Sequence, residues 1–135
     1  MKVWFVDDQA SNREHWRKSF PKGIAGLSLR TFTGVDSILA ALRTETPDIL
    51  FIDFFLDGRT GLEVVAFCRS RANEAPHPVL IAHSSLDSAS ERMVEGGADF
   101  AVPKEKIGGV IPAIRDAIRT KADLETIVST RRWIA

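Results

Sequence analysis

The sequence predicts an α/β protein in which five parallel strands form one sheet with helices on both faces. Three short runs, at residues 3–6, 49–52 and 79–82, are apolar throughout, as is typical of strands buried on both faces. Segments with the periodicity of amphipathic helices separate these runs. Because alternating strands and helices favour parallel pairing, we expect a doubly wound sheet.

Five strands are expected in all. Residues 27–32 alternate apolar and polar side chains, which indicates a strand nearer the edge of the sheet. Residues 100–102 form a short apolar run before a proline. In chain order the predicted strands are residues 3–6, 27–32, 49–52, 79–82 and 100–102.

Helical segments follow each of these strands, and prolines and glycines end several of them. A loop with Asp57, Gly58 and Gly61 is expected after the third strand, and Cys68 is expected to be a small core residue of the next helix. The predicted helices are residues 12–20, 35–42, 62–71, 88–96 and, as one long helix or two in succession, 108–134.

Composition and charge exclude several classes of protein. The chain has 135 residues, 44% of them hydrophobic and 27% charged, which is typical of one globular domain. Its 18 basic and 18 acidic side chains cancel, whereas a strong nucleic-acid binder usually carries a basic excess. One cysteine allows no internal disulfide, and no apolar run approaches the roughly 18 residues that a membrane span requires. We therefore expect a cytoplasmic protein that binds neither nucleic acid nor membrane.

Polar residues stand where four of the predicted strands end. Taken alone, either acid of the Asp7–Asp8 pair could simply cap the next helix, since aspartate is a favoured N-cap. However, the carboxyl ends of parallel strands share one edge of the sheet, and ligands of such sheets bind there. The residues expected at this edge are Asp7 and Asp8, Asp53, His83 and Ser84, and Lys104.

The residue types at this edge suit a magnesium ion and a phosphoryl group. Three carboxylates form a hard oxygen site of the kind that Mg²⁺ prefers, and the ion would offset their mutual repulsion. Asp53 is the best candidate for a covalent phosphoryl acceptor, because a stiff apolar strand precedes this single carboxylate. Lys104 could pair with a phosphoryl oxygen, and His83 or Ser84 could donate a hydrogen bond to it.

Short motifs at matching spacing give the chain a resemblance to a known family. They are VDD at residues 6–8, DILFID at 48–53, Gly61, PVLIA at 78–82, GAD at 97–99 and Lys104. Over about residues 2–118 the chain resembles the CheY-like receiver domain of response regulators, the phosphoacceptor half of two-component signalling. The resemblance implies a flavodoxin-like sheet with the strand order 2-1-3-4-5.

The resemblance also implies roles for individual residues. Asp53 matches the acceptor that takes a phosphoryl group from a histidine kinase, and Lys104 matches the lysine that contacts this group. Asp7 and Asp8 match the acid pair that holds Mg²⁺, with Asp8 as the more direct ligand. The backbone carbonyl of Phe55 matches the group that completes the metal site.

Several positions depart from the family's pattern. His83 stands where a threonine or serine switch residue is usual, and Ser84 beside it could serve instead, so both stay candidates. Ala101 replaces the usual aromatic residue of the fifth strand, and Asp57-Gly58 stands where an apolar residue and a proline are common. The usual threonine-and-tyrosine switch is therefore incomplete, and we expect the response to phosphorylation in residues 84–107.

Two other functions fit parts of this pattern. A pseudo-receiver would keep the fold and act as an interaction module without phosphate, and His83 and Ala101 favour that alternative. A hydrolase or phosphotransferase of similar topology would need a second acid two residues after Asp53, where Phe55 stands, and no glycine-rich phosphate loop is found either. We therefore expect a signalling domain and not an enzyme.

The expected domain limits leave a short extension. Residues 1–120 are predicted to form the receiver domain, and residues 121–135 a helical extension or a linker. The partners that the resemblance implies are a histidine kinase or phosphotransfer protein and, downstream, another protein or an output domain. Pairing of two copies through the extension stays open.

Overall fold

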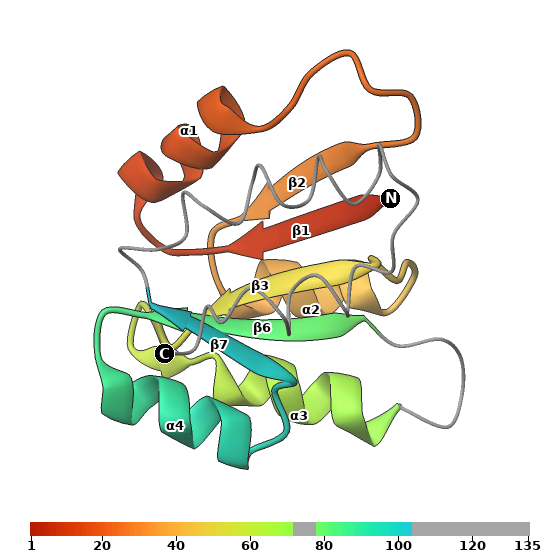
Figure 1. The fold of residues 1–135 in the computed structure, drawn as a ribbon. Coiled ribbons are helices and arrows are strands. Elements are labelled where there is room, and N and C mark those ends of the chain that lie inside the picture. The colour runs from red at the N-terminus through yellow and green to blue at the C-terminus, as the bar shows by residue number, and fades with distance from the viewer. Residues whose placement is uncertain (72–77, 104–135) are drawn as a thin grey trace.

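The computed structural model describes residues 1–71 and 78–103 of the chain (Figure 1). Five parallel strands form one sheet in the order β2-β1-β3-β6-β7, which confirms the predicted fold class and strand order. The strands are β1 (Lys2–Val6), β2 (Ser28–Phe32), β3 (Ile49–Asp53), β6 (Val79–Ser84) and β7 (Phe100–Pro103).

Helices cover both faces of this sheet in the described part of the chain. Through Trp16, α1 packs on the face that carries Phe5 and Phe51, while α2, α3 and α4 pack on the opposite face. The helices are α1 (Ala10–Ser19), α2 (Val35–Leu42), α3 (Leu62–Ser70) and α4 (Asp87–Glu95). The predicted helical segment 108–134 and Lys104 lie outside the described residues.

Two hydrophobic clusters follow from the alternation of side chains along each strand. In β1, Phe5 packs in the cluster beneath α1, whereas Trp4 and Val6 pack in the cluster beneath the other three helices. In β3, Phe51 packs in the cluster beneath α1, and Leu50 packs in the cluster beneath the other three helices. Because successive side chains of a strand point to opposite faces, the position of each acid in its strand decides which face of the sheet its side chain leaves.

A short hairpin follows β3 where the sequence predicts only a loop. It consists of β4 (Phe55–Leu56) and β5 (Arg59–Thr60), paired antiparallel. Asp57 and Gly58 form its two-residue turn with φ of 50° and 78°. Type I′ turns require positive φ at both central residues, and their twist matches that of the two strands of a hairpin. Asp-Gly is a favoured pair at these two positions.

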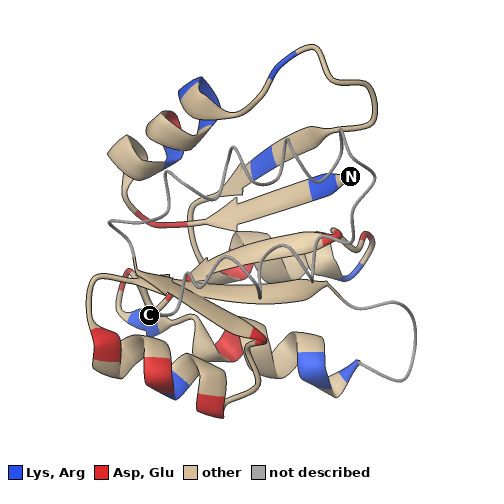
Figure 2. Ribbon diagram, in the orientation of Figure 1, with Lys and Arg blue, Asp and Glu red and all other residues tan. Residues whose placement is uncertain are grey.

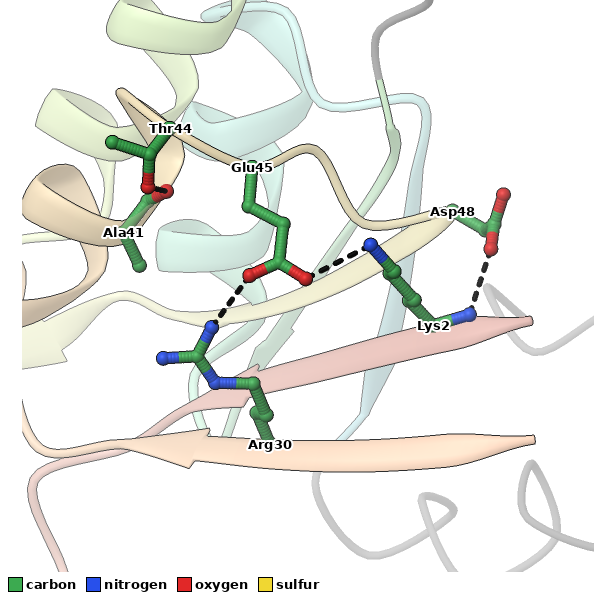
Figure 3. A network of polar contacts seen from close by, with 6 residues as sticks. All are labelled: Lys2, Arg30, Ala41, Thr44, Glu45 and Asp48. Atoms are coloured by element: carbon green, nitrogen blue, oxygen red, sulfur yellow. Dashed lines mark hydrogen bonds and ion pairs between the residues drawn. The ribbon is translucent and has the colours of Figure 1, made fainter. Parts of the chain in front are cut away.

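A polar network joins the start of β1, the middle of β2 and the segment before β3 (Figure 3). The Glu45 carboxylate accepts hydrogen bonds from the Lys2 ammonium at 2.8 Å and from the Arg30 guanidinium at 2.9 Å. The backbone N–H of Lys2 donates to the Asp48 carboxylate at 2.7 Å. Hydrogen bonding to Lys2 first, and the charges of Lys2 and Arg30 as well, hold the pKa of Glu45 below its ordinary value.

Candidate functional site

Three carboxylates from the ends of two neighbouring strands meet at one edge of the sheet. Carboxylate oxygens of Asp7, Asp8 and Asp53 all lie within 4.8 Å of one another. Asp7 is fully buried and Asp53 is 3% exposed, whereas Asp8 is open to solvent. The structure therefore brings together the three acids that the sequence placed at this edge.

The buried Asp7 carboxylate is oriented by the first turn of α1. Its Oδ1 accepts a hydrogen bond from the Gln9 N–H at 2.8 Å, and its Oδ2 accepts one from the Asn12 side chain at 3.0 Å. Arg13 donates to the backbone carbonyl of Asp7 at 2.8 Å. Sequence reasoning missed Asn12 and Arg13, because their roles depend on how α1 is oriented relative to the end of β1.

The exposed Asp8 carboxylate is joined to the β4–β5 hairpin. Its Oδ2 accepts a hydrogen bond from the backbone N–H of Asp57 at 3.0 Å. The hairpin also carries Phe55, whose side chain is 49% exposed and whose partner across the hairpin is Thr60. The hairpin thus contacts Asp8 through Asp57, and it also contains Phe55, whose backbone carbonyl is an expected ligand of the metal.

Gly61 lies directly against the backbone of Asp53. A Cβ at Gly61 would lie 2.3 Å from the carbonyl oxygen of Asp53 and 2.7 Å from a methyl carbon of Ile52. Both distances are shorter than the contacts that Cβ atoms make in folded proteins. The N–H of Gly61 donates to the carbonyl of Phe54 at 2.8 Å. A glycine is therefore required here by the close approach of two backbone segments.

His83 and Ser84 are both part of β6, which extends two residues beyond the predicted strand. His83 is the Cα partner of Asp53, so both side chains leave the same face of the sheet. The imidazole stacks on the ring of Phe5, with centroids 4.9 Å apart and planes 12° apart. Ser84 must point to the other face, and its hydroxyl accepts a hydrogen bond from the N–H of Leu86 at 3.2 Å.

Ala101 lines a hollow between α4 and β7. Figure 2 shows several acidic positions along α4. Three acidic residues of this helix line a groove of about 450 Å³. Phe100 packs against the hydrophobic cluster on the opposite face of the sheet. The groove is lined by Asp87, Ser90, Glu91, Val94, Glu95, Ala101 and Pro103.

The donor set of the acid cluster fits a hard divalent cation. Carboxylate oxygens are the ligands that Mg²⁺ prefers, and a cation among them would offset their repulsion. Lys104, which the sequence analysis placed beside the acids, lies outside the described residues. In the described part of the chain, no helix is long and apolar enough to span a membrane.

Comparison with known proteins identifies a family model and similar regulators that match this chain. Residues 3–114 match the family model of the response regulator receiver domain. The DNA-binding transcriptional regulator NtrC of Salmonella typhimurium is 33% identical over 116 residues, which are 86% of this chain and 24% of NtrC. The regulatory protein LuxO of Vibrio cholerae is 29% identical over 99 residues, which are 73% of this chain and 22% of LuxO. The chain thus spans about a quarter of the length of these relatives.

Solved structures share the fold at lower sequence identity. The phosphorylated cyanobacterial phytochrome response regulator RcpA has a TM-score of 0.71 at 14% identity, over 90% of this chain and 96% of its own. The response regulator TrrA of Thermotoga maritima, solved in complex with Mg²⁺ and BeF, has a TM-score of 0.62 at 21% identity, over 76% of this chain and 85% of its own. With the family match covering most of its length, the chain belongs to the response regulator receiver domain family.

Proposed function

We propose that Asp53 accepts a phosphoryl group from a histidine kinase or a phosphotransfer protein in the presence of Mg²⁺. The observation that carries this proposal is the meeting of three carboxylates within 4.8 Å, with Asp53 at the end of β3. Membership of the receiver family supports the same role. The domain would act in the cytoplasm as a signalling component and not as an enzyme.

The residues that would hold the cation are Asp7, Asp8, Asp53 and the backbone carbonyl of Phe55. Asp7 is buried and oriented by two hydrogen bonds, so it would act as a fixed wall of the site. Asp8 is exposed, and the resemblance to receiver domains implies that it would be the more direct ligand. When bound, the cation supplies positive charge that neutralises an incoming phosphoryl group.

The transfer step forms one bond and breaks another. A carboxylate oxygen of Asp53 forms the new P–O bond, while the P–N bond to the donor imidazole breaks and its nitrogen keeps the electron pair. Lys104 would pair with a phosphoryl oxygen. His83 would donate to the phosphoryl group from the face it shares with Asp53; Ser84 would need its hydroxyl to leave Leu86.

The surface that would respond lies at α4 and β7. A phosphoryl group adds about −1.5 to −2 charges at neutral pH, which biases an existing equilibrium between two arrangements of nearby loops. The groove lined by Ala101 and Val94 is the surface we propose for a downstream protein or an output domain. Its lining supports this, because apolar residues such as Val94 and Ala101 lie beside three acidic ones, a mixture that suits a protein partner.

Incubation of the intact chain with acetyl phosphate and Mg²⁺ tests the proposal, with Asp53→Asn as the matched control. We expect a mass increase of one phosphoryl group that requires Mg²⁺ and is lost in the variant. Beryllofluoride with Mg²⁺ should change amide exchange in residues 84–107. Absence of both effects in the folded wild-type chain would contradict the proposal.

An interaction module that works without phosphate is the second candidate. Two observations favour it: an imidazole lies where a hydroxyl is usual, and Ala101 leaves a hollow where an aromatic ring is usual. The chain would then bind its partner equally well with Asp53 or Asn at position 53. Mg²⁺-dependent labelling of Asp53 would exclude this candidate.

A further inference from the structure

The β4–β5 hairpin has too few backbone pairs to be stable by itself. Each of its strands is two residues long, and a short isolated hairpin is marginally stable in water. On one side it is anchored by Leu56, which is 2% exposed in the cluster beneath α2, α3 and α4. The second strand is exposed or half-buried, so it needs another anchor.

Arg59 provides that anchor by bridging two helices. Its guanidinium pairs with the Asp36 carboxylate in the first turn of α2, and its Nε donates to the Glu63 carboxylate of α3 at 2.9 Å. The planar fork of arginine can hold two acids in fixed directions, which lysine cannot do. Hydrogen bonding to Asp36 first, and to Glu63 second, raises the pKa of Arg59 above its ordinary value.

Arg59 and the acid cluster are connected through the hairpin turn. Asp57 lies two residues before Arg59 and donates its N–H to Asp8 Oδ2 at 3.0 Å. Asp8, Asp57 and Arg59 line the same groove of about 660 Å³, with the start of α2 as its other wall. A shift of the hairpin away from α2 would therefore move this donor away from the Asp8 carboxylate.

We propose that Arg59 is a positioning residue of the cation site, which holds the hairpin so that the Asp57 N–H orients the Asp8 carboxylate. The inference rests on the proposed function, because it concerns the same cation site. Arg59 acts through Asp57 and Asp8 and is not itself a ligand. The effect is local, since exposed ion pairs contribute little to global stability.

Three roles for Arg59 predict three different results when it is replaced by alanine. A positioning role predicts weaker Mg²⁺ binding, because Asp8 loses its orientation. A purely electrostatic role predicts tighter binding, because a positive charge near the acids is removed. A purely structural role predicts unchanged binding and a small loss of stability.

Isothermal titration of the intact chain with Mg²⁺ separates these roles. We expect Arg59→Ala to weaken binding about three- to ten-fold, less than the ~10–100-fold cost of losing a direct outer-shell partner. Arg59→Lys should be intermediate, because it keeps the charge but not the fork. Arg30→Ala is the matched control, since Arg30 makes a comparable exposed pair with Glu45 and does not line the groove of Asp8, Asp57 and Arg59.

The amide of Asp57 supplies a readout that does not depend on the cation. We expect its hydrogen exchange to speed up in Arg59→Ala and to be unchanged in Arg30→Ala. Equal or tighter Mg²⁺ binding by Arg59→Ala overturns the inference while leaving the proposed function standing. Failure of the folded wild-type chain to bind Mg²⁺ overturns both.

Discussion

Asp53 and His83 are Cα partners in the neighbouring parallel strands β3 and β6, and both are almost fully buried. Their side chains leave the same face of the sheet, and the imidazole is held by its stack on Phe5. Where a small hydroxyl is usual in this family, the chain thus carries a ring that is also part of the core. Substitution at this position should affect stability as well as signalling.

Replacement of His83 by alanine should therefore cost more than replacement of Ser84. We expect His83→Ala to lower the free energy of unfolding by about 2–4 kcal/mol, because a buried ring and its stacking are lost. Ser84→Ala should cost about 1 kcal/mol, since it loses one hydrogen bond with Leu86. Urea unfolding followed by circular dichroism checks both values. Equal losses in the two variants would mean that the stack contributes nothing.

Gly61 should tolerate no side chain. We expect Gly61→Ser to lower the free energy of unfolding by about 3 kcal/mol or more, because its Cβ would collide with the backbone of Asp53. Gly34→Ser is the matched control: nothing lies within 4 Å of a Cβ there, and serine is a good N-cap for α2. The control should stay within about 0.5 kcal/mol of the wild type, and thermal unfolding of both variants tests the contrast.

Cys68 should be unreactive in the folded protein. Burial raises the pKa of its thiol to about 11, and the side chain is 4% exposed. We expect no labelling by a thiol reagent at pH 8 in the native state and rapid labelling in denaturant, because the thiolate is the reactive form. The double variant Cys68→Ala, Ala66→Cys moves the thiol to the exposed side of α3 and should react without denaturant.

The same thiol makes a small contribution to the pH dependence of stability. Burial raises its pKa on folding from the ordinary value of 9.0, so the folded state favours the neutral form. Between about pH 9 and pH 11 the unfolded chain ionises and the folded chain does not, which favours unfolding by up to ~1.4 kcal/mol per pH unit. Cys68→Ala should lose less stability than the wild type over this interval in urea titrations.

Removal of one acid should distinguish the repulsion among the three carboxylates from their binding of a cation, because the two effects change stability in opposite directions. Without Mg²⁺ we expect Asp8→Asn to be more stable than the wild type by about 1 kcal/mol, because one like charge leaves the cluster. With Mg²⁺ at a hundred times its dissociation constant, the wild type should gain ~2.7 kcal/mol and the variant much less. Thermal unfolding with and without the ion measures both effects. A variant stabilised as strongly as the wild type by Mg²⁺ would argue against Asp8 as a ligand.

Unbroken apolar runs were enough to predict β1, β3 and β6, because these strands are buried on both faces, whereas the strand order was implied by the family resemblance. The apolar pattern failed at the end of β6, where His83 and Ser84 are polar yet 1% and 3% exposed. A polar side chain ends an apolar run in the sequence, whereas a strand ends where backbone pairing stops. The acid cluster was predicted because parallel strands end at one edge.

The residues that support the site could not be predicted in the same way. Asp57-Gly58 is a known hairpin signal, but its flanking strands are too short to show any alternation. The contact of Asn12 with Asp7 depends on the angle at which α1 leaves β1, and the bridge of Arg59 depends on two helices distant in the sequence. Such contacts arise from tertiary packing, which no local pattern encodes.

The central place of β1 in the sheet has a consequence for the order of folding events. β1 pairs with β2 on one side and with β3 on the other, and β3 comes last of the three in the chain. Asp53 therefore meets Asp7 only after the long connection through β2 and α2 has closed, a step that costs chain entropy. A cation that needs both acids can stabilise only those states of the chain in which that closure has already formed.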